Sequence, residues 1–248
     1  MRIEQCFFEG APTRGAEYAC LHRDGSREMK REGILSEHHL RVTFNYVSIP
    51  AFELVCLPQH LPELVLGHLL TEGQICSFGD VEKLVIHKSG DHAEVFLNPV
   101  AEPPELRSVA ALDWKMKWIF NLADRFALGM PLHRYTYATH SCLLARGEEL
   151  LFACEDIGRH NALDKAVGYA FRNGVDLKEC LLYSSGRIPA DMVRKAIRAG
   201  IPILVGKGSP TAEAVELARR YGLTLICAAR KDQMKQFSGP EPLDLKEE

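Results

Sequence analysis

Residues 179–228 read ECLLYSSGRIPADMVRKAIRAGIPILVGKGSPTAEAVELARRYGLTLICA, and this stretch decides the fold. Its short apolar runs are typical of buried strands, and helical patterns separate them. The runs lie at 179–184, 201–205 and 223–228, and the helical patterns lie at 160–172, 189–199 and 211–221. Strands that alternate with helices through short links favour right-handed crossovers and a largely parallel sheet.

The preceding part of the chain predicts a second group of strands and helices. Alternation from Leu40 to Ile49 indicates a half-buried strand, and a helix is expected from Pro62 to about Gly73. Ser108 is placed to cap a long helix. The other expected elements are strands at 51–57, 82–88 and 92–98, a helix at 109–128, and a hairpin with arms at 135–146 and 149–155.

These patterns predict an α+β protein, with an N-terminal mixed β/helix region before a C-terminal α/β domain. The N-terminal domain is expected to span 34–130 and the C-terminal domain 131–236. Residues 1–33 show no clear periodicity and predict an irregular segment. The polar tail, 237–248, predicts a frayed end.

The bulk composition is that of a soluble globular protein: 248 residues, 46% hydrophobic and 25% charged. A net charge of −3 gives no global attraction to nucleic acid or anionic membranes. Neither an apolar run of membrane-spanning length nor the apolar core of a signal peptide is visible, so a cytoplasmic location is expected. The eight cysteines form no C-x-x-C pair and are expected to be reduced, mostly buried thiols.

Four polar turns, three of which contain glycine, follow the expected strands and should meet in one crevice, because such sheets bind ligands beyond the carboxyl ends of their strands. Helix starts there offer free N–H groups, and arginine binds phosphate oxygens bidentately, so the crevice suits a phosphorylated anion. Each turn alone is also explained by helix capping and solvated surface charge. The turns are 155–161, 184–187, 207–211 and 230–232, and their candidate ligand-binding residues outside the first turn are Ser185, Gly186, Arg187, Lys207, Arg230 and Lys231.

The densest polar segment is EDIGRHNALDK at 155–165. Its candidate ligand-binding residues are Asp156, Arg159, His160 and Asn161. Leu163 and Lys165 are expected to support or solvate the helix. The structural alternative is an ion pair of Glu155 or Asp156 with Arg159 that fixes the turn.

Two familiar motifs are only approached. In GIPILVGKG at 200–208, five residues rather than four separate Gly200 from Gly206, and Lys207 precedes glycine, so the stretch is not a P-loop. His92-Ala93-Glu94 matches half of a zinc deaminase signature, but no P-C-x-x-C accompanies it. No His/Cys set shows zinc spacing, so no bound metal is expected.

Cys142 and Cys154 lie on the two arms of the expected hairpin, where pairing about the turn brings them within one residue of register. Reduced core cysteines explain them. The alternative is a thiol near the anion crevice that acts as a sulfur carrier or nucleophile, with His140 tuning Cys142 from the same strand face.

Three segments, CEDIGRHNALDKAVGYA (154–170), SSGRIPADMVRKAIRAGIPILV (184–205) and SPTAEAVELARRYGLTLICAAR (209–230), closely resemble the formate dehydrogenase accessory protein family of the FdhD type. LPELVLGHLLTEGQI (61–75) agrees more weakly, and the resemblance covers about 37–231. It implies a dimeric sulfur carrier that takes sulfur from a cysteine desulfurase. The sulfur would pass to the molybdenum bis(pterin guanine dinucleotide) cofactor and so to formate dehydrogenase.

The resemblance also implies a C-terminal fold similar to that of cytidine deaminases, without the zinc. The family's cofactor-binding stretch falls on Ala228, Ala229, Arg230, Lys231, Asp232 and Gln233.

One departure concerns the family's C-G-x-C-G loop, whose cysteine holds the persulfide. Residues 98–114 contain no cysteine, and the segment that follows reads Tyr137-Ala138-Thr139-His140-Ser141-Cys142, without the usual glycines. Another thiol, Cys142, would then carry the sulfur, or the chain is a cofactor-binding chaperone without sulfur chemistry. A third reading is a nucleotide hydrolase or deaminase that has lost its zinc.

Overall fold

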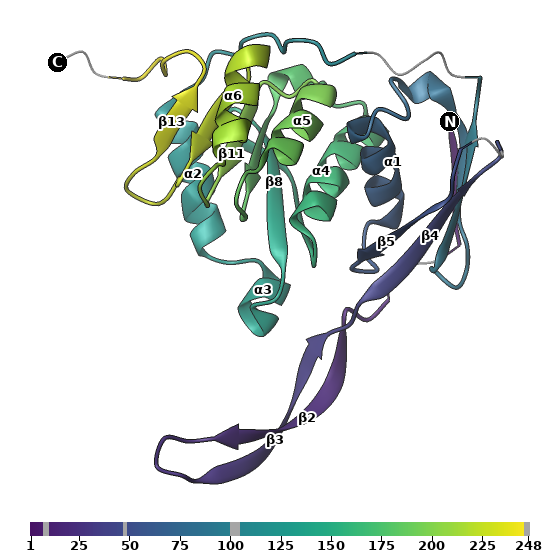
Figure 1. The fold of residues 1–248 in the computed structure, drawn as a ribbon, viewed down its shortest axis with the longest axis vertical. Coiled ribbons are helices and arrows are strands. Elements are labelled where there is room, and N and C mark those ends of the chain that lie inside the picture. The colour runs from purple at the N-terminus through teal and green to yellow at the C-terminus, as the bar shows by residue number, and fades with distance from the viewer. Residues whose placement is uncertain (7–9, 47–48, 100–104, 246–248) are drawn as a thin grey trace.

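The computed structural model describes residues 1–248 except 7–9, 47–48, 100–104 and 246–248, and also omits the side chain of Phe78 (Figure 1). Three sheets carry the fold, with strand orders β1-β6-β7-β4-β5, β13-β12-β11-β10-β8-β9 and β2-β3. The predicted α+β class is confirmed. The likeness of the C-terminal part to deaminases stays a prediction. Within the described residues, every helix is too short or too polar to span a membrane.

The six-stranded sheet has a parallel centre made by the strand–helix alternation that the sequence predicts. Its parallel strands are β10 (Leu181–Ser184), β11 (Ile203–Gly206) and β12 (Thr224–Cys227). Antiparallel strands flank them: β8 (His140–Arg146), β9 (Glu149–Asp156) and β13 (Lys235–Ser238). The helices are α4 (Arg159–Asn173), α5 (Ala190–Arg198) and α6 (Ala212–Tyr221), and a 3-10 turn, η2 (Leu177–Glu179), precedes β10.

Both faces of this sheet are covered. Leu144 and Leu182 belong to the core that also contains residues of α4, α5 and α6. Tyr183, the next residue along β10, points to the opposite face and packs with residues of α2 (Met116–Ala127). The strands are therefore buried on both sides, which explains their uninterrupted apolar runs.

The N-terminal sheet packs against the same interior through α1 (Leu61–Thr71). Its strands are β1 (Arg2–Gln5), β4 (His38–Phe44), β5 (Phe52–Cys56), β6 (Val81–Ile86) and β7 (His92–Leu97), and a 3-10 turn, η1 (Phe78–Asp80), leads into β6. Figure 1 shows α1 beside α4, between this sheet and the six-stranded one. The strands at 40–49, 51–57, 82–88 and 92–98 and the helix from Pro62 are thus confirmed, with ends shifted by a few residues, while residues 47–48 of the first strand lie outside the described part of the chain.

Helices α1 and α4 cross at two glycines. A Cβ added to Gly67 would lie 1.8 Å from the carbonyl oxygen of Asp164, and one on Gly168 would lie 1.8 Å from that of Glu63. The backbones therefore touch, and one hydrophobic core runs from the N-terminal sheet to the six-stranded sheet. The division of the chain at 130 stays a prediction, while α2 packs on the six-stranded sheet.

The prediction that residues 1–33 are irregular is wrong. Strand β1 pairs in parallel with β6, and β2 (Thr13–Leu21) pairs with β3 (Arg27–Leu35) in a hairpin that projects from the body (Figure 1). Most side chains of this hairpin are exposed on both faces, so no apolar alternation marks it in the sequence. We call β2–β3 the arm.

The tail is not frayed in its described part, 237–245. The Trp114 indole donates a hydrogen bond of 2.9 Å to the carbonyl of Pro240. The carboxylate of Asp244 accepts from the backbone N–H groups of Met116 and Lys117, at 2.6 and 3.2 Å. The tail thus caps α2, a long-range contact that no local pattern encodes.

Two element boundaries were also wrong. The helix expected at 109–128 begins at Met116, because Val109 is held extended by a 2.9 Å hydrogen bond from its N–H to the carbonyl of Tyr221. The first hairpin arm, expected from 135, begins at His140. Helix α3 (Pro131–Thr136) occupies the earlier residues, with its proline in the first turn.

Candidate functional site

A pocket of about 490 Å³ lies at the carboxyl ends of the parallel strands, where the sequence predicted a crevice. We call it the Lys207–Arg230 pocket. The turns after β10, β11 and β12 contribute Ser185, Lys207, Gly208 and Arg230. The other lining residues are Phe126, His133, Tyr137, Ala138, Thr139, His140 and Ser141.

Backbone hydrogen bonds join the turns after β10, β11 and β12 to one another. The N–H of Lys207 donates to the carbonyl of Ser184 at 2.9 Å, and that of Gly208 donates to Gly186 at 3.2 Å. The N–H of Ala228 donates to Gly208 at 3.0 Å. A Cβ on Gly208 would lie 2.8 Å from the carbonyl oxygen of Gly186, so glycine permits this close approach.

The two cations of the pocket are free of ion pairs. Neither Lys207 nor Arg230 lies within 4.0 Å of a carboxylate in the part of the chain that the structure describes, and both side chains are exposed. The Lys207 ammonium sits 5.3 Å from the ring centroid of Phe126. These cations are therefore available to an anionic ligand.

His140 and Ser185 form the polar wall of the pocket. Ser185 Oγ accepts a 3.0 Å hydrogen bond from the N–H of Ser141 and lies 3.1 Å from His140 Nδ1. Burial lowers the pKa of His140, and the nearby Arg159 guanidinium lowers it further. The lowered pKa favours the neutral imidazole at neutral pH, and this ring shares a hydrogen bond with the Ser185 hydroxyl.

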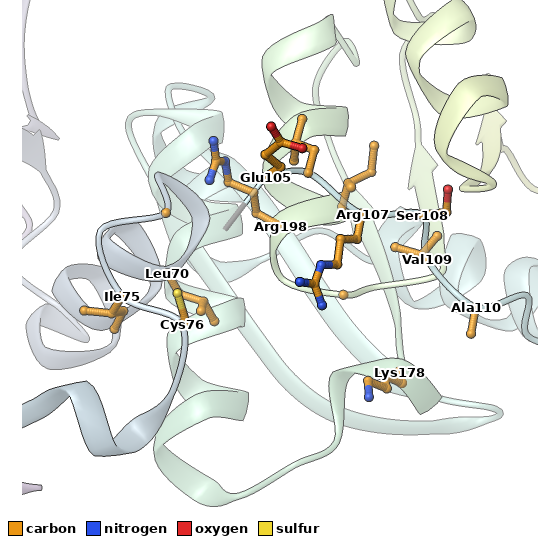
Figure 2. Close-up of a pocket in the computed structure, with 14 residues that line it drawn as sticks. Leu70, Ile75, Cys76, Glu105, Arg107, Ser108, Val109, Ala110, Lys178 and Arg198 are labelled. Atoms are coloured by element: carbon orange, nitrogen blue, oxygen red, sulfur yellow. The ribbon is translucent and has the colours of Figure 1, made fainter. Parts of the chain in front are cut away.

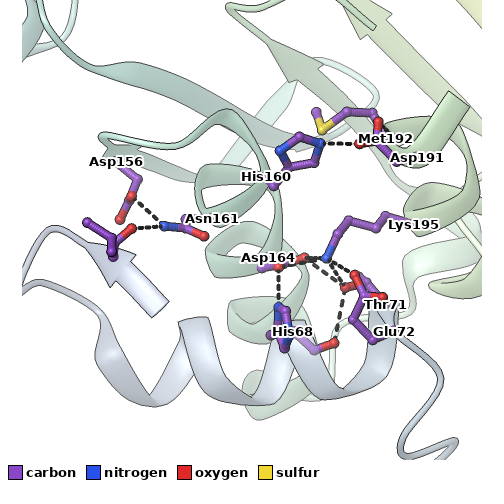
Figure 3. A network of polar contacts seen from close by, with 11 residues as sticks. His68, Thr71, Glu72, Asp156, His160, Asn161, Asp164, Asp191, Met192 and Lys195 are labelled. Atoms are coloured by element: carbon purple, nitrogen blue, oxygen red, sulfur yellow. Dashed lines mark hydrogen bonds and ion pairs between the residues drawn. The ribbon is translucent and has the colours of Figure 1, made fainter. Parts of the chain in front are cut away.

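Asp156 and Asn161 build the framework and do not line the pocket. Asp156 is fully buried and pairs with the fully buried Lys165 at 2.6 Å. It also accepts from the N–H of Leu57 at 3.0 Å, and Asn161 donates both to Asp156 and to the carbonyl of Val55 (Figure 3). The expectation that a carboxylate of EDIGRHNALDK fixes the turn is correct in kind, but the partner is Lys165 and not Arg159. Of the two roles expected for Lys165, support of the helix and solvation, the first is confirmed and the second is wrong, because the side chain is fully buried.

Glu155 has a second structural role. Its carboxylate accepts from the backbone N–H groups of Leu132 and His133, at 2.9 and 2.7 Å, and from the hydroxyl of Thr139 at 2.8 Å. It therefore caps α3 and fixes the segment that closes one side of the pocket.

His160 faces a different hollow, of about 290 Å³, and its Nε2 lies 2.8 Å from the Asp191 carboxylate (Figure 3). Asp164 lines the same hollow and binds Lys195 at 2.9 Å. Burial alone would raise the pKa of Asp164, but the His68 hydrogen bond and the Lys195 charge hold it below the ordinary value. This network joins α1, α4 and α5.

The remaining predicted residues differ in position. Arg159 packs over Gly186, and its Nε is buried without a hydrogen-bond partner in the described chain. Arg187 is exposed outside the pocket lining. In the stretch from Ala228 to Gln233, only Arg230 lines the pocket among the described residues. Ala228 has a φ of 48° and Ala229 is buried. The other residues, Lys231, Asp232 and Gln233, are exposed in a turn that is closed by a 2.8 Å hydrogen bond from the Arg230 N–H to the carbonyl of Gln233.

Cys142 lies in the core and does not reach the pocket. The strand register places it directly opposite Cys154, as expected, and both thiols are buried. Burial raises the pKa of Cys142 well above its ordinary value. His140 contacts Ser185, so nothing in this geometry activates the Cys142 thiol.

A second cavity, of about 460 Å³, lies at the other end of the six-stranded sheet. Figure 2 shows the side chains of Cys76, Arg107, Lys178 and Arg198 around it. Lys178 precedes β10, so this cavity is at the amino ends of the strands, away from the Lys207–Arg230 pocket.

Sequence reasoning missed the aromatic and imidazole groups Phe126, His133 and Tyr137 of the pocket. His133 lies between the expected helix and the expected hairpin, whereas Phe126 belongs to the expected helix and Tyr137 to the expected hairpin arm, and no motif marks any of the three as a ligand-binding residue. The one usable signal was the Gly129 and Pro131 pair, which marks a turn that leads into α3.

Comparison with known proteins gives consistent results. The model of the FdhD/NarQ family matches residues 97–244. A Methanothermobacter thermautotrophicus protein named "Sulfur carrier protein FdhD" is 29% identical over 236 residues, covering 88% of this chain and 94% of the relative. A Geobacillus kaustophilus protein of the same name is 29% identical over 232 residues, covering 83% and 88%. The crystal structure of a formate dehydrogenase accessory protein from Desulfotalea psychrophila superimposes with a TM-score of 0.80 at 26% identity, covering 93% of this chain and 98% of the other.

Proposed function

The chain belongs to the FdhD/NarQ family, whose named members are sulfur carriers and formate dehydrogenase accessory proteins, and on that premise we propose that it binds the molybdenum bis(pterin guanine dinucleotide) cofactor. The Lys207–Arg230 pocket is the proposed site. The observation that carries this proposal is a pair of cations without carboxylate partners, set at the ends of three joined turns.

The chemistry of the pocket suits one nucleotide arm of such a cofactor. Arg230 and Lys207 would bind the pyrophosphate, since guanidinium and ammonium groups pair strongly with phosphate oxygens. The rings of Phe126 and Tyr137 offer flat apolar surface to a base. A volume of about 490 Å³ is in the range of small-molecule sites.

The proposed cargo step passes sulfur from a cysteine desulfurase to this cofactor, which then serves formate dehydrogenase. Sulfur transfer requires a thiol that a donor protein can reach. Cys142 does not meet this requirement, whereas Cys6 and Cys76 are exposed and Cys20 is partly exposed. A homodimer, as the family resemblance implies, is part of the same proposal.

Calorimetric titration with GDP tests the binding step. We expect Arg230→Ala and Lys207→Ala each to weaken binding about 10- to 100-fold, the loss of one or two charge-assisted hydrogen bonds. Lys235→Ala is the matched control, because Lys235 is an exposed cation on β13, outside the pocket lining. Absence of GDP binding to the wild type at millimolar concentration would contradict the proposal.

A further inference from the structure

The arm carries a cluster of three reactive side chains: Cys20, His22 and Glu28. The thiol sulfur, one imidazole nitrogen and one carboxylate oxygen all lie within 4.8 Å of one another. Cys20 on β2 is directly opposite Glu28 on β3. The proposed cofactor site makes no use of this cluster.

Cys20 differs from the other seven cysteines in being accessible and close to both an imidazole and a carboxylate, within the described residues. Five cysteines are buried: Cys56, Cys142, Cys154, Cys180 and Cys227. Among the accessible thiols Cys6, Cys20 and Cys76, only Cys20 belongs to such a group with both an imidazole and a carboxylate, within the described residues. Cys76 lies at the end of the six-stranded sheet opposite the cofactor pocket.

The neighbours of Cys20 include an imidazole and a carboxylate that contacts it. His22 Nε2 lies 3.2 Å from Glu28 Oε1, so the carboxylate orients the ring. The Lys30 ammonium lies 2.5 Å from the same oxygen. The hydrogen bond to Glu28 raises the pKa of Lys30, so the ammonium keeps its positive charge beside this carboxylate.

We propose that Cys20 is the thiol on which this chain carries sulfur, with His22 as its base. The proposal rests on the sulfur-carrier function proposed above. The Cys20 thiol gives its proton to His22, and the thiolate attacks the terminal sulfur of a persulfide on the donor's cysteine. A new S–S bond forms on Cys20 and the donor's S–S bond breaks. The sulfur of the donor's own cysteine leaves as a thiolate and takes the proton from His22. The step needs no oxidant or reductant.

The position of the arm suits a carrier. At its base, the N–H of Gly33 donates a 3.1 Å hydrogen bond to the Tyr135 hydroxyl of α3, and α3 also supplies His133 to the Lys207–Arg230 pocket. The arm therefore leaves the body of the molecule beside α3 (Figure 1), the helix that supplies His133 to the pocket. Leu21 and Met29 alternate with Cys20 and Glu28 along their strands and are 75% and 62% exposed, which gives the opposite face of the hairpin an apolar contact surface for a donor protein.

The test is persulfide mapping on the full chain by mass spectrometry. The protein is incubated with inorganic polysulfide in one experiment and with a cysteine desulfurase and cysteine in another, and peptides with one added sulfur atom are identified. We expect the added sulfur on Cys20 and its loss in Cys20→Ser. His22→Gln should slow loading at least about tenfold near neutral pH, with the rate recovering as pH rises.

Two variants outside the cluster serve as controls. His39→Gln should load normally, since His39 pairs with Glu53 at 2.6 Å without a cysteine in the group, and Cys76→Ser should also load normally. Sulfur on Cys6 or Cys76 but not Cys20 would overturn this inference and leave the sulfur-carrier function standing. If no thiol carries a persulfide after incubation with either donor, both the Cys20 inference and the proposed sulfur-carrier function would be overturned. Loading of Cys20 only after a chelator has removed zinc would identify the cluster as a metal site and overturn the inference.

Discussion

Among single residues, Asp156 and Lys165 form the contact on which the site framework depends. Both side chains are fully buried, and their 2.6 Å ion pair is completed by bonds to Leu57 and Asn161. Lys165→Met would leave Asp156 buried without its counter-charge. Removal of one partner from a buried pair costs about 3–5 kcal/mol, so we expect a loss of that size in the free energy of unfolding, measured by urea denaturation.

Lys178→Met is the control for this prediction. Lys178 is exposed, so the same chemical change should alter the free energy of unfolding by less than about 0.5 kcal/mol. Equal stability of Lys165→Met and the wild type would mean that Asp156 finds another partner, and the framework role would be wrong.

His140 predicts a pH dependence. Its pKa is lowered in the folded state by burial and by Arg159, from an ordinary value of 6.5. Between the folded and unfolded pKa values the unfolded chain binds more protons, so stability is lost as pH falls from about 6.5 through the lower folded value.

His140→Gln removes that titration and keeps a polar group beside Ser185. We therefore expect the free energy of unfolding of the wild type, minus that of the variant, to decrease as pH falls from 7.5 to 5.5. Groups shared by both chains, such as Asp164 and His68, cancel in the difference. A difference that is flat with pH, or one that grows in acid, would contradict the assigned direction.

At the scale of elements, the crossing of α1 and α4 depends on glycine. Gly168→Ala places a Cβ 1.8 Å from the carbonyl oxygen of Glu63, and the contact is backbone, which cannot rotate away. Alanine favours a helix by up to about 1 kcal/mol over glycine, yet overpacking costs about 1–3 kcal/mol or more. We expect a net loss in the free energy of unfolding and a lower Tm.

Gly79→Ala is the matched control for the crossing. Its nearest neighbour to an added Cβ is 3.6 Å away, an ordinary contact, and its φ is not positive. It should unfold close to the wild-type Tm. A Gly168→Ala protein as stable as the Gly79→Ala protein would show that the two helices can separate without cost.

Elements were predictable where local chemistry decides them. The strands β10, β11 and β12 are buried on both faces, so their apolar runs and the intervening helices are visible in the sequence. The arm and the cap of α2 by Asp244 were not visible, because an exposed hairpin has no apolar face and the cap comes from residues more than a hundred positions away.

The candidate site shows the same limit. Lys207 and Arg230 were predicted because both follow strands whose ends meet by topology. Asp156 and Asn161 were assigned to the ligand because their partners Leu57 and Val55 come from the N-terminal half, about a hundred residues earlier. The number of charged residues in a turn does not show whether a residue binds a ligand or forms a structural hydrogen bond between two sheets.

On the scale of the whole molecule, the layer of α1 and α4 joins the two large sheets. One hydrophobic core contains Leu40 and Val95 of the N-terminal sheet together with Leu144 and Leu182 of the six-stranded sheet. Two independent domains would unfold in separate transitions, whereas a continuous core favours one. The shared core therefore predicts a single cooperative transition.

Two probes that report on opposite ends of this core can test cooperativity. Both tryptophans, Trp114 and Trp118, lie on the α2 side of the six-stranded sheet, so their fluorescence follows that end. Denaturant-dependent hydrogen exchange of the β4 and β7 amides follows the N-terminal sheet. We expect one urea midpoint for both probes in the wild type.

Lys165→Met should lower both midpoints equally, because the Lys165 ion pair and its hydrogen bond to the carbonyl of Leu57 join the two ends of the core. An earlier midpoint for β4 and β7 would separate the N-terminal sheet as an independent unit and reduce the α1–α4 crossing to a contact between domains.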